Sequence, residues 1–233
     1  MNNQVYVVAT IRPWNIKVYS EIIRHYPGQW HLITKPEDLT VEKIKSLSPK
    51  YLFFPHWSHI VPVEILNLTD CICFHEADLP YGRGGSPIQN LIARGHRETV
   101  ISAIKMVNEL DAGPVYLKEP LSLEGLAEEI FIRASYIVAD MIKKIIEKCP
   151  EPKEQTGEPV IFKRRTPKQS EIPVKLDNLS ELFDHIRMLD AEGYPAAYIE
   201  NGNFKYEISR PVLKTDGVVA DVRITKIDGG KND

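Results

Sequence analysis

The sequence predicts an α/β fold: a doubly wound, mostly parallel sheet followed by a small C-terminal α+β annex. A β-branched run at 5–11, VYVVATI, is typical of a strand buried on both faces. Similar runs alternate with amphipathic stretches up to about residue 148, which favours parallel strands joined by crossover helices. Beyond residue 150 this alternation gives way to short strands and a hairpin signal.

The first elements follow from apolar spacing. The stretch 16–26 carries apolar residues at helical spacing and ends at Pro27-Gly28, where a helix cannot continue. Later apolar runs predict strands at 30–34, 51–55 and 71–74, separated by helices at 40–47 and 62–66. This order is Rossmann-like.

The helix after residue 85 has the clearest start signal in the chain. Ser86 is a predicted N-cap, Pro87 suits the first helical position, and Gln89 completes a capping box. Gly95 follows the last turn. Two further strands are predicted at 98–107 and 113–123, before a long amphipathic helix within 122–148.

The remaining chain predicts a linker and a small subdomain. Residues 151–168 are rich in proline and charge, which is typical of a linker between a catalytic domain, 1–150, and a subdomain, 169–233. The subdomain contains a predicted helix at 179–189, a hairpin at 196–208 and strands at 211–215 and 219–226. Asn201-Gly202 predicts a type I′ turn in the hairpin.

Composition excludes several classes of protein. The 233 residues are 43% apolar with a formal net charge of −3, so no overall basic field indicates nucleic acid or an anionic membrane as partner. The sequence shows neither a leader nor an apolar run long enough to span a bilayer. Its three cysteines lack metal-type spacing, and no GxGxxG motif indicates a dinucleotide. We therefore expect a reduced, cytoplasmic protein without a metal site.

Candidate chemistry gathers where predicted strands end. His75 follows the strand at 71–74, and ligands of parallel α/β sheets bind beyond the carboxyl ends of strands. Glu76 and Asp78 lie beside it, and a glycine-rich loop leads to a helix N-terminus with unpaired N–H donors. Asp111 begins a second turn. A purely structural histidine and an Asx-turn are the alternatives.

Two more loops border the same edge of the predicted sheet. The loop at 10–16 contains Arg12, Trp14 and Asn15, which could hold a substrate, although a packed tryptophan is an equal alternative. The loop at 55–62 contains His56 and His59, but no third ligand with metal-type spacing accompanies them.

The segments ICFHEADLPYGRGGSPIQNLIARG and MVNELDAGPVYLKEPLSL resemble the core of the formyltetrahydrofolate-dependent formyltransferases. The resemblance implies formyl transfer from 10-formyltetrahydrofolate to an amine, with His75 and Asp111 as the catalytic pair. Such chemistry needs a group that takes and gives protons near neutral pH. The residues implied in donor binding are His59, Ile60, Val61, Asp78, Leu79, Pro80, Gly84, Gly85 and Ser86.

One position departs from that family. Cys73 stands where the family has an asparagine whose amide binds the formyl oxygen, and a thiol is a weaker donor. Loss of one such donor commonly costs about 10²–10³-fold in rate. Backbone N–H groups of 82–86, Ser58 or His59 are possible substitutes, and a nucleophilic Cys73 is a further alternative.

The tail GEPVIFKRRTPKQSEI resembles sugar N-formyltransferases, including those of pseudaminic-type acid biosynthesis. This resemblance implies an amino-sugar acceptor, nucleotide-linked and in a surface-glycan pathway, without nucleic acid or membrane as partner. A homodimer is a further expectation. The residues implied in acceptor binding are Arg12, Trp14, Asn15, Arg83, Lys163 and Arg165. A formyltetrahydrofolate hydrolase, a methionyl-tRNA formyltransferase-like enzyme and a non-catalytic binding relative are the alternatives.

Overall fold

The computed structural model describes residues 4–227, so the outer ends of both predicted domains, 1–3 and 228–233, lie outside the described residues. The chain divides into two compact units. The first contains 1–87, 98–121 and 131–162, and the second contains 88–97, 122–130 and 163–233. This division differs from the predicted one, because most of the predicted linker belongs to the first unit and two short segments of the predicted catalytic domain belong to the second.

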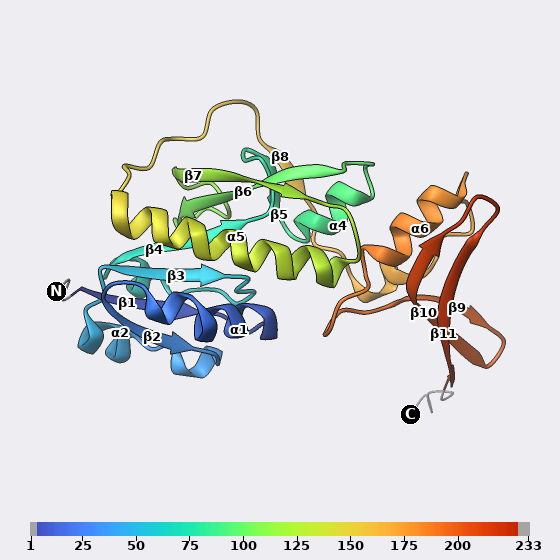
Figure 1. The fold of residues 1–233 in the computed structure, drawn as a ribbon, viewed down its shortest axis with the longest axis horizontal. Coiled ribbons are helices and arrows are strands. Elements are labelled where there is room, and N and C mark those ends of the chain that lie inside the picture. Colours follow the sequence, from blue (N-terminus) through green and yellow to red (C-terminus); the bar gives the residue numbers. More distant parts are fainter. Residues whose placement is uncertain (1–3, 228–233) are drawn as a thin grey trace. The chain divides into compact units, whose positions relative to one another are not determined.

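A six-stranded sheet forms the centre of the first unit, in the order β2-β1-β3-β4-β6-β7 (Figure 1). Its strands are β1 (Val5–Ala9), β2 (Gln29–Ile33), β3 (Tyr51–Pro55), β4 (Asp70–His75), β6 (Glu98–Lys105) and β7 (Val115–Ser122). The first four pair in parallel, whereas β4 and β6 are antiparallel. The predicted α/β class with a mostly parallel sheet is thus confirmed.

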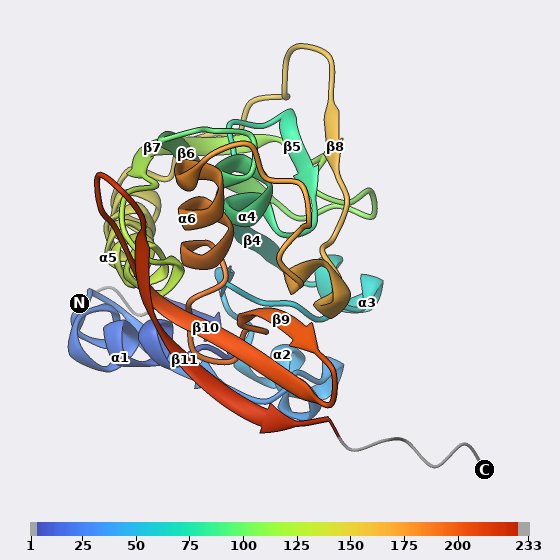
Figure 2. The same ribbon diagram turned by 90° about the vertical axis from the view of Figure 1, so that its right-hand side faces the viewer.

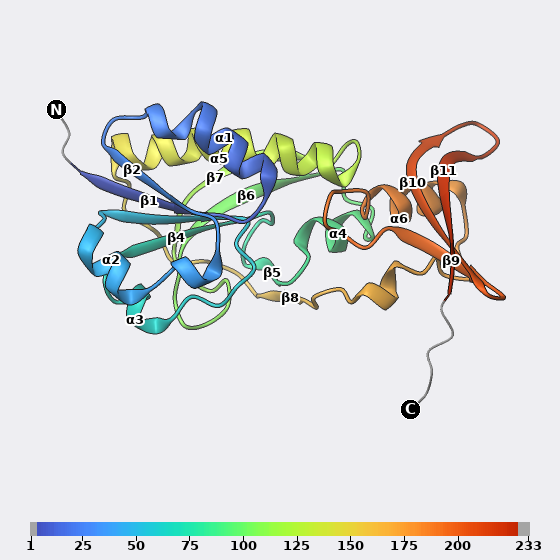
Figure 3. The same cartoon turned by 90° about the horizontal axis from the view of Figure 1, so that it is seen from below.

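Helices cover both faces of this sheet, as a doubly wound fold requires. The α1 helix (Pro13–Glu21) and α5 (Ala127–Lys148) lie on one face, and α2 (Val41–Leu47) and α3 (Val63–Leu66) lie on the other (Figures 1 and 3). The predicted helix at 16–26 is split, because α1 ends at Glu21 and a separate turn, η1 (Ile23–His25), follows. Among the described residues, no helix is both long and apolar enough to cross a bilayer.

The alternating side chains of the buried strands explain these two layers. Val7, Leu52 and Phe54 belong to one cluster, which includes Ile44 of α2 and Ile65 of α3. On the opposite face Tyr6 stacks on Trp30 with ring centroids 4.7 Å apart. Burial of such apolar side chains is the main stabilising contribution in a sheet covered on both faces.

The predicted loop at 78–87 and the predicted linker contain a second, two-stranded sheet. Strand β5 (Tyr81–Gly84) pairs in parallel with β8 (Val160–Phe162). Further upstream, Lys153 and Val115 exchange two backbone hydrogen bonds, of 2.7 and 2.8 Å. Backbone hydrogen bonds therefore hold residues 151–162 in place within the first unit. The composition of this segment did not indicate such pairing.

The second unit contains a three-stranded antiparallel sheet with one helix beside it (Figure 2). Its C-terminal elements are η3 (Pro167–Ser170), α6 (Leu179–Arg187), β9 (Ala197–Asn201), β10 (Phe204–Leu213) and β11 (Val218–Lys226). The predicted strand at 211–215 is wrong as a separate element. It continues β10 through an irregularity at Arg210, whose φ is 52°.

One predicted turn and one predicted N-cap also differ from the structure. Asn201 pairs with Phe204, so Gly202 and Asn203 form the hairpin loop, and only the glycine has positive φ, 59°. Glycine at the first central position indicates a type II′ rather than a type I′ turn. The helix α4 (Pro87–Ile92) begins where predicted, but Ser86 has a φ of 54°, outside the extended conformation of an N-cap.

A buried arginine ties α6 to the segment at 122–126 within the second unit. The Arg187 guanidinium donates from Nε to Asp184 Oδ1 at 2.6 Å and from Nη1 to the carbonyls of Leu123 and Gly125 at 2.6 and 2.8 Å. Its side chain is 1% exposed. The carbonyls of Leu123 and Gly125 therefore both bind this one cation, and Asp184 Oδ1 accepts from it and, at 3.0 Å, from Arg97 Nη1.

Replacing this cation should destabilise the protein strongly. We expect Arg187→Met to lower the free energy of unfolding by about 3–5 kcal/mol, since it leaves a buried carboxylate without its closest cation. Urea unfolding measures the change, and Arg223→Met, at an exposed arginine of β11, is the matched control. A loss below about 1 kcal/mol, the value of a surface ion pair, would contradict this role.

Candidate functional site

The side chains of His75 and Asp111 meet in the first unit. His75 is the last residue of β4, and Asp111 lies in the turn between β6 and β7. His75 Nδ1 lies 3.6 Å from Asp111 Oδ2, and the two side chains are only 9% and 12% exposed. The structure thus brings together the two residues that the sequence singled out, although they are far apart along the chain.

The loop between β4 and α4 fixes both members of this pair through its backbone. His75 Nε2 lies 2.7 Å from the Gly82 carbonyl oxygen, which can only accept a hydrogen bond. Nε2 is therefore the donor in this contact, and Nδ1 faces the carboxylate. The Gly84 N–H donates to Asp111 Oδ2 at 2.9 Å. One short strand, β5, thus orients both the imidazole and the carboxylate.

The glycines of this strand allow that close approach. Gly84 has a φ of 107°, and a Cβ there would lie 2.3 Å from the Phe162 carbonyl oxygen of β8. The Gly82 φ is 87°. Since other residues rarely adopt this conformation, any side chain at 84 would push β5 away from β8. The glycine-rich sequence is therefore explained by packing of two strands beside the pair.

The turn that carries Asp111 is equally constrained. Asp111 has a φ of 53°, and a Cβ at Gly113 would lie 1.7 Å from the Lys105 carbonyl oxygen. Gln155 Nε2 donates to the carbonyls of Asp111 and Gly113, at 2.8 Å each. The same side chain accepts from Arg83 through Oε1. Sequence reasoning missed Gln155, because it lies in a segment without apolar periodicity.

Two of the proposed oxyanion donors are already engaged within the fold. The Gly84 N–H binds Asp111, and the Gly85 N–H donates to the Phe162 carbonyl at 3.1 Å. Cys73 precedes His75 on β4 and is half-buried. Burial and the charge of Asp111 raise the pKa of the Cys73 thiol. The thiolate that nucleophilic catalysis requires is thus disfavoured.

A further acid lies beside the pair. Burial raises the pKa of the Glu76 carboxyl, the charge of Asp111 raises it further, and the charge of His75 opposes the shift. Glu76 follows the histidine directly, and sequence reasoning noted it only as a local carboxylate. A raised pKa favours the protonated carboxyl, which can donate a hydrogen bond.

The predicted acceptor residues are not all accessible. Arg83, 14% exposed in its side chain, donates to Gln155 at 2.9 and 3.0 Å and contacts Glu109 at 3.3 Å. Trp14 stacks on Phe131 at a centroid distance of 5.2 Å with an interplanar angle of 3°. Arg12 lies over Trp14 at 5.8 Å. Trp14 is thus mainly a packing residue, the alternative left open by its sequence.

Other predicted residues have mixed surroundings. Trp14 and Asn15 are each 6% exposed. Ile60 is 96% exposed, whereas Val61 and Leu79 are buried in the core. Asp78 pairs with Lys118 Nζ at 2.5 Å, and that ammonium also donates to the Leu79 carbonyl at 2.7 Å. Lys163 and Arg165 belong to the second unit.

His56 is unsuited to a charged role. It follows β3 and contacts Phe131 edge to face at a centroid distance of 4.7 Å. Burial, together with the charge of Arg12, lowers the pKa of His56 to about 3. The imidazole is therefore neutral near pH 7. Within residues 4–227, no cluster of three or more His, Cys, Asp or Glu side chains could hold a metal ion.

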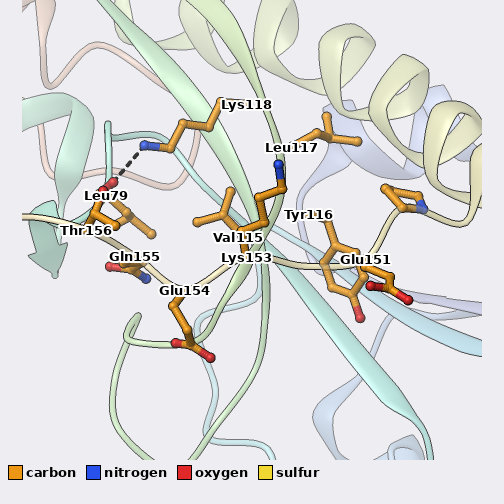
Figure 4. Close-up of a pocket in the computed structure, with 11 residues that line it drawn as sticks. Leu79, Val115, Tyr116, Leu117, Lys118, Glu151, Lys153, Glu154, Gln155 and Thr156 are labelled. Carbon is orange, nitrogen blue, oxygen red and sulfur yellow. Dashed lines mark hydrogen bonds between the residues drawn. The ribbon is translucent and has the colours of Figure 1, made fainter.

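A groove of about 590 Å³ lies between β7 and the segment at 150–156 (Figure 4). Leu79, one of the residues implied in binding the formyl donor, lines this groove. Gln155 also lines the groove and binds the Asp111 turn. The full lining consists of Leu79, Val115, Tyr116, Leu117, Lys118, Pro150, Glu151, Lys153, Glu154, Gln155 and Thr156.

Comparison with known proteins identifies the family. The formyl transferase family model matches residues 23–125, and the model of the methionyl-tRNA formyltransferase C-terminal domain matches residues 167–225. The solved methionyl-tRNA formyltransferase from Clostridium thermocellum is 45% identical, with a TM-score of 0.93. The alignment covers 96% of this chain and 99% of that one. The chain belongs to the formyltransferase family. This membership agrees with the predicted enzyme class and with the predicted donor, 10-formyltetrahydrofolate.

Curated relatives of this chain are also methionyl-tRNA formyltransferases. The methionyl-tRNA formyltransferase of Campylobacter lari is 31% identical over 170 residues, which are 70% of this chain and 54% of that protein. The chain thus spans about half the length of the curated relatives that it matches. A sugar N-formyltransferase from a Shewanella species, by contrast, is 13% identical with a TM-score of 0.70, covering 89% of this chain and 97% of that one. That likeness shows only a shared fold.

These comparisons correct two predictions about the formyltransferase. The predicted amino-sugar acceptor, with its glycan-biosynthesis pathway, is wrong, because the relatives with substantial identity are methionyl-tRNA formyltransferases. The expectation that no nucleic acid takes part is contradicted by the same names. The net charge of −3 gave no indication of that class, yet its C-terminal model matches residues 167–225. The expected homodimer and cytoplasmic location stay predictions.

Proposed function

We propose that the chain transfers the formyl group of 10-formyltetrahydrofolate to the α-amino group of methionyl-tRNA. The observation that carries this proposal is the 45% identity to the Clostridium thermocellum methionyl-tRNA formyltransferase over nearly the whole of both chains. The match of the second unit to that enzyme's C-terminal domain model supports the same acceptor. The alternative that sequence reasoning held in reserve is thus the better-supported one.

The proposed chemistry is proton transfer around a tetrahedral carbon. The amine nitrogen forms a bond to the formyl carbon, and the bond between that carbon and N10 of the folate then breaks. The amine must lose a proton, and N10 must gain one. His75 takes up the proton that the amine loses and gives a proton to N10. The imidazole is therefore unchanged after each turnover. Asp111 stabilises the imidazolium in between, as its place beside Nδ1 allows.

The donor would lie along the loops that meet this pair. We propose the segments at 59–61 and 78–86 as its binding residues. Ile60 and His59 are exposed in the first segment, and Leu79 of the second lines the groove of Figure 4. Apolar walls with a few polar groups are typical of small-molecule sites. His75 can then transfer protons if the formyl group of the bound donor lies at the end of β4.

A local cationic cluster supports tRNA as the acceptor despite the net charge of −3. Lys163 and Arg164 are exposed and Arg165 is half-buried in the segment that leads into η3, and Lys168 is exposed within η3. Neutralising phosphates with such side chains releases counterions, so binding through this cluster weakens steeply with salt. Lys163 and Arg165, predicted as sugar-binding residues, would contact phosphate in this proposal.

The test is identification of the product. The protein is incubated with 10-formyltetrahydrofolate and methionyl-tRNA, and the amino acid released from the tRNA by mild base is analysed by mass spectrometry. We expect N-formylmethionine, and none with uncharged tRNA or free methionine. Tetrahydrofolate released at equal rates with and without an acceptor would indicate a hydrolase and contradict the proposal. Formylation of a nucleotide amino sugar, but not of methionyl-tRNA, would contradict it as well.

Variants of Cys73 test how the formyl oxygen is held. We expect Cys73→Asn to raise the transfer rate, by about tenfold or more, since a properly placed oxyanion donor is worth about 10²–10³-fold. Cys73→Ala should stay within about threefold of the wild type, because a weak thiol donor contributes little. Steady-state kinetics of both variants measure this. Loss of all activity in Cys73→Ala would instead indicate a specific role for the thiol.

A further inference from the structure

Gln155 connects two loops of the site through one side chain. Nε2 donates to the carbonyls of Asp111 and Gly113, at 2.8 Å each, and so uses both of its hydrogens. Oε1 accepts from Arg83 Nε at 3.0 Å and from Nη2 at 2.9 Å. The half-buried amide is therefore satisfied on both sides.

The contacts of Gln155 matter because the Asp111 turn is strained. Asp111 has a φ of 53°, a conformation that non-glycine residues keep only when their surroundings impose it. The two bonds from Gln155 bracket the turn at positions 111 and 113. On the other side, the Gly84 N–H holds the Asp111 carboxylate. Backbone and side chain of Asp111 are thus fixed by different segments.

The segment that carries Gln155 is itself held in place. Lys153, two residues earlier, exchanges two backbone hydrogen bonds with Val115 of β7. Five residues later, β8 begins its pairing with β5. Gln155 thus lies between two anchored stretches, beside the groove of Figure 4, and its amide has a defined position relative to the turn.

We infer that Gln155 is a positioning residue for the reaction, which sets the place of the Asp111 carboxylate against His75. The inference rests on the proposed formyl transfer for its kinetic consequence but not for its structural one. Gln155 does not contact His75 in the structure; it acts through Asp111. Displacing a reacting group by about 1 Å can cost about 10²-fold in rate. The predicted linker thus supplies a residue of the site.

The kinetic experiment is a double-mutant cycle. Gln155→Met keeps the length of the side chain and removes its hydrogen bonds, and Gln155→Glu keeps an acceptor for Arg83 while losing the donor to the turn. We expect each to lower kcat by about 10- to 100-fold with KM for methionyl-tRNA within about twofold. In the Asp111→Asn background, Gln155→Met should cost less than about threefold, because the residue that it positions is already disabled. Glu158 is exposed in the same segment and lies outside the groove lining, so Glu158→Gln is the matched control.

An acceptor-independent measurement separates this inference from the proposed function. NMR of the His75 imidazole, assigned by its loss in His75→Ala, reports the carboxylate beside Nδ1. We expect Gln155→Met and Gln155→Glu to move the His75 signals toward their position in Asp111→Asn, and Glu158→Gln to leave them unchanged. If wild-type protein makes no formylmethionyl-tRNA, the proposed function fails, and this spectrum still decides the inference. Unmoved His75 signals in both Gln155 variants, or equal fold losses of kcat in both backgrounds, would overturn it.

Discussion

Replacing His75 by alanine should lower the rate of formyl transfer to methionyl-tRNA by about 10²–10⁴-fold, the usual contribution of a general acid–base group. In the proposed mechanism the imidazole takes a proton from the amine, and in the structure its partners are Asp111 at 3.6 Å and the Gly82 carbonyl at 2.7 Å. Single-turnover kinetics with labelled donor measure the loss. His25→Ala, at an exposed histidine of η1, should retain the wild-type rate.

A second variant separates chemistry from folding. Since His75 is 7% exposed, alanine also leaves the Gly82 carbonyl without its donor, at a cost of about 1–3 kcal/mol. His75→Gln offers an amide donor in its place but cannot accept and return a proton. We expect His75→Gln to unfold closer to the wild type and still to lose the activity. A His75→Gln enzyme within about tenfold of the wild-type rate would exclude proton transfer by this residue.

Adding one methyl group at Gly113 should damage both stability and activity. The Cβ of Gly113→Ala would lie 1.7 Å from the Lys105 carbonyl oxygen, a backbone atom of β6. The turn must therefore move, and Asp111 moves with it. We expect a loss of about 3 kcal/mol in the free energy of unfolding, at the upper end for overpacking, and about a 10²-fold lower rate from the displaced carboxylate.

The matched control is a glycine with room for a side chain. A Cβ at Gly217 would have no heavy atom within 4 Å, so Gly217→Ala should leave stability within about 0.5 kcal/mol and the rate unchanged. Urea unfolding and transfer assays are run on both variants. Equal behaviour of Gly113→Ala and Gly217→Ala would show that the close approach of the Asp111 turn to β6 does not hold in solution.

The sheet and the position of His75 were predictable because both depend on local signals. Buried parallel strands form continuous apolar runs, and the carboxyl end of such a run is where ligands bind in this fold class. Asp111 was found through its resemblance to a family motif, since an Asp-x-Gly turn by itself equally indicates an Asx-turn. Tertiary structure brings His75 and Asp111 together, and the spacing of residues along the sequence does not reveal that contact.

The contacts that hold the site were not predictable for the same reason. Gln155 binds backbone carbonyls, and such bonds leave no periodic pattern in the sequence. The segment around it is rich in proline and charge, so its composition indicated a linker, while its backbone pairs with β7 and β5. Trp14 is a similar case, because its ring packs on Phe131, more than a hundred residues away along the chain.

The acceptor was predicted wrongly because whole-chain averages were used for a local property. A net charge of −3 describes the chain, whereas phosphate contact depends on where cations gather, as at 163–168. The resemblance of the tail to sugar N-formyltransferases was equally misleading, since the C-terminal domain model of methionyl-tRNA formyltransferase matches residues 167–225. Fold and donor follow from the core of the first unit, whereas the proposed acceptor rests in part on the family match of residues in the second.

The most direct test of the paired roles of His75 and Asp111 is a double-mutant cycle on the single-turnover rate of formyl transfer. His75→Ala, Asp111→Asn and the double variant are compared with the wild type in one assay. If the carboxylate acts through the imidazole, the double variant is about as slow as His75→Ala alone, because groups that act as a unit are not additive. A double variant slower by the product of the two single losses would contradict the account.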